Sequence, residues 1–188
     1  MDFRSCGKGV WVRMGIFSKL AERLQKQKLF HNDGEELLVY LSEGIKELEK
    51  VESFCVTLNV KNYHQSSNRK RLWKRLLQAK IWFEKAQEVE QKTRLISNIS
   101  MEIINKGRLR MKILNSKEAA FVNSLDTGTI FSSISKLNYL LTFPDELQQF
   151  MRTVVEMVVS IKSLKEDLEK LIALEERVMK IYYEAWGS

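Results

Sequence analysis

A hydrophobic repeat with alternating steps of four and three residues fills the C-terminal part of the chain, and it constrains the fold most. Nine of its ten positions are apolar, and the exception is Glu175. A 3.5-residue period held over so many turns places these side chains along one side of a long α-helix, where another helix covers them. The sequence therefore predicts a coiled-coil-like C-terminal helix that opens at Pro144. We call its apolar positions the seam: Phe150, Val154, Met157, Ile161, Leu164, Leu168, Leu171, Val178 and Tyr182.

The rest of the chain also has a helical pattern, since one proline and eight glycines in 188 residues leave few helix breakers. We expect an all-α fold, an antiparallel bundle of three long helices plus two or three short ones. Residues 1–13 are expected to form a flexible arm and residues 14–188 a single helical-bundle domain. The expected helices span residues 35–59, 68–105 and 144 onward, with shorter ones at 14–30, 117–125 and 130–142; residues 106–115 extend the second long helix or form an irregular linker.

Apolar spacing also predicts which side chains of the first two long helices enter the core. On the first helix these are Leu37, Leu41, Leu48, Val51, Cys55 and Leu58, with Ile45 beside them. On the second they are Leu72, Leu76, Ala79, Phe83, Ala86, Val89, Thr93, Ile96, Ile99 and Ile103.

The positive charge of the chain is concentrated in one segment. The net charge is +7, yet residues 65–115 alone hold 13 basic and 4 acidic side chains, an excess of +9. Several cations crowd the predicted start of the second long helix, where they oppose the helix dipole. The alternative is neutralisation by Glu43, Glu47 or Glu169 of adjacent helices. The candidate anion-binding residues are Arg69, Lys70, Arg71, Lys74, Arg75 and Lys85, with Arg108, Arg110 and Lys112 as a second patch.

Aromatic residues among these cations do not form a base-stacking surface on a helical wheel. Trp73 and Trp82 are nine residues apart, so they fall on opposite flanks of the apolar stripe. Leu77 and Ile81 point with the lysines instead of the core. We expect a second neighbouring helix to cover these two residues; the alternative is that they face a partner.

Catalytic and metal-binding patterns are weak. Asp126-Thr127-Gly128-Thr129 matches the short motif of aspartic proteases, but it occurs once and between helical segments. We interpret Gly128 as a helix stop and Thr129 as the cap of the next helix. The two histidines, His31 and His64, have no further ligands at metal-binding spacing. We therefore expect no enzyme activity, no cofactor and no metal.

Three functions fit this sequence. The first is a non-enzymatic helical interaction or scaffold protein, with protein as its partner, that self-associates through the C-terminal helix. The second is a nucleic-acid-binding module that uses residues 69–75. The third is a peripheral membrane protein that binds an anionic surface through the amphipathic segment 14–30. Two cysteines and no evident secretion signal or membrane-spanning run predict a reducing, cytoplasmic location.

Overall fold

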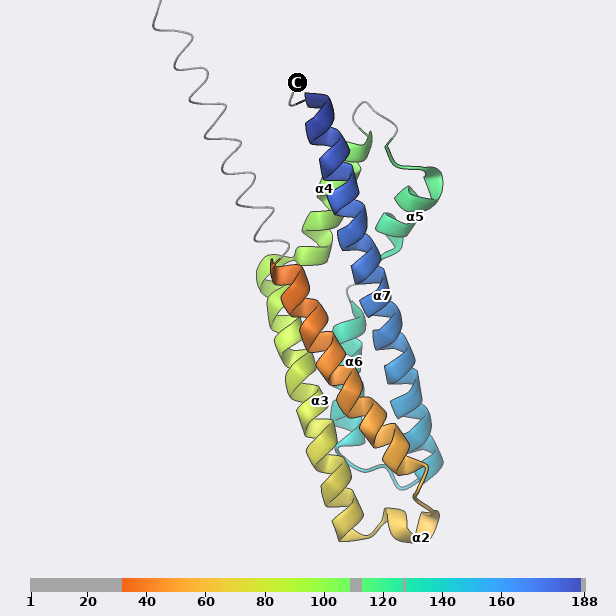
Figure 1. Cartoon of the computed structure of the whole chain (residues 1–188). Helices are drawn as coiled ribbons and strands as arrows, with labels where there is room; N and C mark the ends of the chain where they lie inside the picture. The colour runs from red at the N-terminus through yellow and green to blue at the C-terminus, as the bar shows by residue number, and fades with distance from the viewer. Residues whose placement is uncertain (1–31, 109–112, 127, 187–188) are drawn as a thin grey trace, which may run out of the picture.

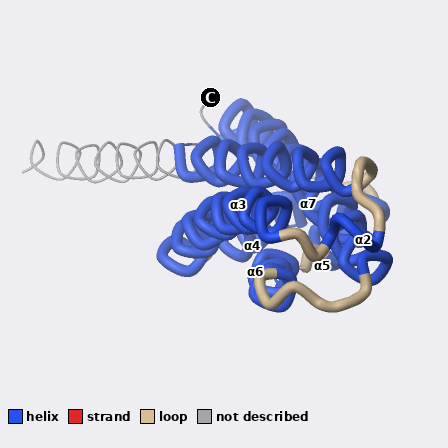
Figure 2. Tube along the Cα trace, turned by 90° about the horizontal axis from the view of Figure 1, so that it is seen from below, coloured by secondary structure: helices blue, strands red, loops and turns tan. Residues whose placement is uncertain are grey.

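The computed structural model describes residues 32–108, 113–126 and 128–186. Every regular element in these ranges is a helix, as Figure 2 shows in a view from below Figure 1. The predictions for the arm and for the helix at 14–30 lie outside the described residues. The helices are one at residues 32–55, here called helix 32–55, then α2 (Val60–Tyr63), α3 (Ser66–Thr93), α4 (Leu95–Arg108), α5 (Ser116–Ser124), α6 (Gly128–Leu140) and α7 (Leu147–Trp186).

The long helices run alternately in opposite directions (Figure 1). Helix 32–55 descends toward α2, α3 and α4 rise, α6 descends, and α7 rises past both α6 and α4. α3 packs against α6, and α7 packs against both α6 and α4. The predicted all-α antiparallel bundle is confirmed.

The seam of α7 lies inside this bundle. Eight of its nine side chains are buried, from Phe150 through Val178, and Tyr182 is half-buried. Because α4 and α6 pack on α7, helices of the same chain cover these positions. The core predicted for the first two long helices is also confirmed, except that Leu58, Val89 and Thr93 are only half-buried.

Helix 32–55 approaches α3 closely at one glycine. A Cβ built on Gly44 would lie 2.7 Å from Cδ1 of Phe83, whose side chain is fully buried. The absent side chain therefore lets the Phe83 ring pack directly on the backbone of helix 32–55. Asn32, Asp33 and Gly34 are part of this helix, although their sequence is typical of a turn.

The long helix predicted over 68–105 is broken at Arg94. This residue adopts a left-handed backbone, with φ 46° and ψ 43°, and separates α3 from α4. Side chains cap the break on both sides: the Glu90 carboxylate accepts the Ile96 amide at 3.2 Å, and the Asn98 amide donates to the Thr93 carbonyl at 2.7 Å. The prediction of a continuous helix was wrong because no glycine or proline marks the site.

The lower end of the bundle is closed by α2 and the loop before α7. The hydroxyl of Tyr63, a buried side chain, donates to the Pro144 carbonyl at 2.8 Å. α7 begins at Leu147, so the prediction that Pro144 opens this helix was wrong. Phe143, just before the proline, has a left-handed φ of 55°, which directs the chain back into the bundle.

Candidate anion-binding surface

Two lysines near the start of α3 are exposed. Lys70 and Lys74 lie one turn apart, and neither forms an ion pair or hydrogen bond with any residue in the described ranges. No acidic residue occupies the first turn of α3. The helix dipole therefore adds to the positive potential of these two side chains.

Arg69, the first of the predicted anion-binding residues, contacts side chains at the α2 end of the bundle. Its guanidinium lies 5.5 Å from the ring centres of both Tyr63 and Phe143, and one of its nitrogens contacts Nδ1 of His64 at 2.5 Å. These contacts hold the α2 end of the bundle together by cation–π attraction. The Arg69 guanidinium is therefore engaged in the fold.

The next two arginines of α3 reach toward helix 32–55. The Arg71 guanidinium lies 4.2 Å from the ring centre of Phe54, and Arg75 donates to the Glu47 carboxylate at 2.9 Å. Lys50 donates to the same carboxylate at 2.6 Å. Burial acts to raise the pKa of Glu47, but the hydrogen bonds from Lys50 and Arg75 outweigh it and hold the pKa below its usual value.

These contacts test the alternative that acidic residues of adjacent helices neutralise the cations of α3. Glu47 does neutralise one cation of the cluster, Arg75. Glu43 pairs with Lys46 of its own helix, and Glu169 pairs with Lys165. Acidic neighbours therefore neutralise the predicted cluster only in part.

Lys85 is held by aromatic rings. Its ammonium lies 4.6 Å from the ring centre of Trp82 and 5.7 Å from that of Tyr40, and these two rings stack on each other. Trp82 thus belongs to the contact between α3 and helix 32–55, whereas Trp73 remains 47% exposed. The two tryptophans form no common platform, as the wheel predicted.

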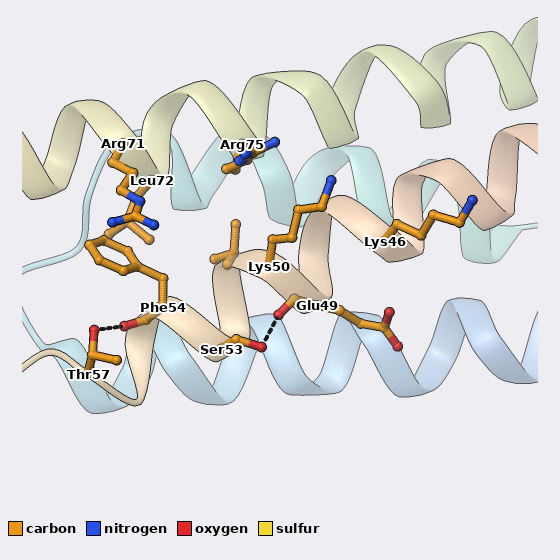
Figure 3. A pocket seen from close by; sticks show the side chains of 10 residues that line it. Lys46, Glu49, Lys50, Ser53, Phe54, Thr57, Arg71, Leu72 and Arg75 are labelled. Atoms are coloured by element: carbon orange, nitrogen blue, oxygen red, sulfur yellow. Dashed lines mark hydrogen bonds between the residues drawn. The ribbon is translucent and has the colours of Figure 1, made fainter.

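A groove of about 520 Å³ lies between helix 32–55 and α3 (Figure 3). Arg71 reaches into it from α3, and Lys50 reaches into it from the opposite wall. Four of its side chains are cationic, one is acidic, and its floor is apolar. The groove is lined by Lys46, Glu49, Lys50, Val51, Ser53, Phe54, Thr57, Arg71, Leu72 and Arg75.

Sequence reasoning missed the two lysines of this groove. Lys46 and Lys50 lie in a segment with a net negative charge, which obscured them. Their i,i+4 spacing puts them on one side of helix 32–55. That spacing was the only available signal, and it does not indicate which helix lies opposite.

The structure does not describe the side chains of the second predicted patch. Arg108 ends α4, its side chain is not described, and Arg110 and Lys112 lie outside the described residues. Leu77 is half-buried, but Ile81 remains 37% exposed, so the described residues do not fully cover the pair. Both side chains are therefore covered in part.

The Asp126 motif acts as a helix cap. One oxygen of the Asp126 carboxylate accepts the Gly128 amide at 2.7 Å, and α6 begins at Gly128. Gly128 therefore begins α6 instead of stopping the preceding helix, and Thr129 lies inside α6 instead of capping it, so both interpretations were wrong; the Asp126 carboxylate accepts the first amide of α6. Cys55 is buried as predicted, and burial, with the nearby Glu52 charge, raises the pKa of its thiol to about 12.

The described residues include no candidate metal site. No group of three His, Cys, Asp or Glu side chains in the described ranges is placed to hold a metal ion. None of the described helices combines the length and apolar character needed to cross a bilayer. Comparison of the chain with protein-family models, curated proteins and solved structures finds no match.

Proposed function

We propose that this protein is a non-enzymatic helical interaction protein that binds nucleic acid through the start of α3. The observation that supports this best is the pair Lys70 and Lys74, exposed and without an acidic partner among the described residues. Cations at a helix N-terminus are locally unfavourable, and a phosphate group beside them removes that penalty. Arg71, which pairs with no carboxylate of the described residues, extends the positive surface toward helix 32–55.

The expected contacts are to the phosphate backbone. Lysine and arginine contribute sequence-independent phosphate contacts, which make binding strongly dependent on salt. Trp73 and Trp82 lie on different sides of α3, so successive bases have no shared stacking surface. We therefore expect binding with little sequence preference.

The test is fluorescence anisotropy with a labelled duplex and a labelled single strand at 50 and 200 mM salt. The variant Lys70→Gln/Lys74→Gln removes the two open cations. For duplex, its plot of log affinity against log salt should be less steep by about 1.8, since each lost phosphate contact contributes about 0.9. Lys92→Gln/Lys117→Gln is the matched control, because both lysines are exposed and lie away from this surface.

Two results would contradict the proposal. One is no binding by the wild-type protein at 50 mM salt. The other is an equal loss in the control variant, which would mean that only net charge matters. Vesicles rich in anionic lipid test the membrane alternative, and binding to vesicles without binding to nucleic acid would assign the surface to a membrane.

Self-association through the C-terminal helix is a second candidate, supported by exposed valines on the outer side of α7. Val155 is 41% and Val159 62% exposed, although the seam on the opposite side is buried. Lys162 of α7 pairs with Glu49 of helix 32–55 at 2.6 Å, so in this antiparallel pair the two valines lie near the end of helix 32–55. Sedimentation of wild type and Val155→Lys/Val159→Lys tests this candidate, and a monomer at high micromolar concentration in both would reject it.

A further inference from the structure

We infer that the groove between helix 32–55 and α3 binds a phosphate monoester group. The group has two possible sources, a free mononucleotide-sized ligand or the terminal phosphate of a nucleic-acid strand. In the strand-end form, the inference rests on the proposed function. The experiment below changes Lys46 and Lys50 for the groove and Lys70 and Lys74 for the strand-binding surface, so the two proposals fail separately.

The first argument is that cations reach into the groove from both of its walls. Arg71 descends from α3 with its guanidinium over the Phe54 ring, and Lys50 rises from helix 32–55 (Figure 3). No carboxylate in the described residues pairs with Arg71. Its guanidinium lies over the ring centre at 4.2 Å, and its N–H groups can donate to a phosphate oxygen.

The second argument is that the neighbouring carboxylates are already engaged. Glu47 accepts from Lys50 and Arg75, and its side chain is only 10% exposed. Glu49 points away from α3 and pairs with Lys162 of α7 at 2.6 Å (Figure 3). Glu49 therefore does not face the space between Arg71 and Lys50, whereas Glu47 pairs with Lys50 itself.

The charge balance matches one phosphate monoester. The charged side chains that line the groove, together with their ion-pair partners, comprise five positive and three negative groups, an excess of two positive charges. A phosphate monoester carries about −1.5 to −2 at pH 7. The groups counted are Lys46, Lys50, Arg71, Arg75 and Lys162 against Glu43, Glu47 and Glu49.

Size and lining indicate what the phosphate is attached to. The volume of about 520 Å³ lies within the range of small-ligand sites, roughly 300–1,000 Å³. Of the three apolar lining residues, Val51 and Leu72 are buried, so the half-buried Phe54 is the one that the ring of a nucleotide can contact. The hydroxyls of Ser53 and Thr57 donate to backbone carbonyls, so phosphate recognition is left to the cations.

The experiment measures binding of one short oligonucleotide with a 5′-phosphate and with a 5′-hydroxyl, and of adenosine monophosphate by calorimetry. Wild type should bind the phosphorylated strand about tenfold more tightly, as expected for charge-assisted hydrogen bonds. Lys46→Gln/Lys50→Gln should reduce this ratio to about one while strand binding through α3 persists. Lys70→Gln/Lys74→Gln should weaken both strands equally and keep the ratio.

Each outcome decides the inference. Equal binding of the two strands together with no binding of adenosine monophosphate overturns it, and leaves the proposed function intact if both strands bind. A preference for the phosphorylated end that survives Lys46→Gln/Lys50→Gln also overturns it. Lysine-dependent binding of adenosine monophosphate without strand binding supports a free ligand and rejects the proposed function.

Discussion

Replacing Gly44 with alanine tests whether the close contact between helix 32–55 and α3 is as tight as the structure shows. The new Cβ would lie 2.7 Å from Cδ1 and from Cζ of the Phe83 ring. Phe83 is fully buried, so its ring has no free space in which to retreat. Either the ring leaves its preferred rotamer or the two helices that form the groove move apart.

Two opposing terms set the magnitude. Alanine in place of glycine inside a helix stabilises it by about 1 kcal/mol. Overpacking a filled core costs about 1–3 kcal/mol, and the contact with Phe83 lies at the severe end of that range because the obstructing atoms belong to a buried ring. We expect Gly44→Ala to lower the free energy of unfolding by about 1–2 kcal/mol, which corresponds to a fall in Tm of about 2–8 °C.

The assay is urea and thermal unfolding followed by circular dichroism, with Gly34→Ala as the matched control. That alanine lies on the same helix, but it meets only the tip of Ile172, at 2.9 Å from Cδ1, and this flexible chain end can shift. In a Phe83→Leu background, Gly44→Ala should cost less, because the clash is relieved. A Gly44→Ala protein as stable as wild type, with no coupling to Phe83→Leu, would refute the reasoning.

Three further predictions concern single residues. Arg94→Gly should leave stability unchanged or raise it by up to about 1 kcal/mol in urea unfolding, because glycine adopts the left-handed backbone that arginine adopts at a cost; a loss of stability would contradict this. Because the pKa of Glu47 is lower in the folded than in the unfolded protein, its ion pairs stabilise the fold fully at pH values above the unfolded pKa, and this stability is lost as the pH falls through the folded pKa. The urea midpoint of Glu47→Gln should therefore depend less on pH below about 4.5 than that of wild type. Cys55, whose thiol has its pKa raised to about 12, should react with iodoacetamide at pH 8 far more slowly than after unfolding, and equal rates would be inconsistent with its burial.

Sequence patterns predicted the helices and their buried sides well, because helical periodicity is a local property. The apolar positions of α7 from Phe150 to Val178 are in the core, as are those of α3 from Leu72 to Ala86. Sequence patterns did not predict features of the backbone that no distinctive residue type marks. The break at Arg94 is an example, since its capping partners Glu90 and Asn98 are ordinary helix residues by sequence.

The candidate site was predicted only in part for a related reason. Charge density pointed to the start of α3, but it could not tell Lys70 and Lys74, which are open, from Arg75, which is paired with Glu47. Pairing depends on which helix lies opposite, and that information is not local. The groove itself combines side chains more than twenty residues apart in the sequence.

The sequence by itself determined that this chain is all-helical and which side of each long helix is apolar. Only the tertiary structure decided what covers those sides. The seam of α7 is a repeat suited to any helical partner, and here α4 and α6 of the same chain cover it. Likewise, a basic segment becomes a candidate anion site only where folding leaves cations without acidic neighbours. The physical reason is that periodicity fixes the direction of a side chain, whereas the identity of its neighbour depends on how the helices pack.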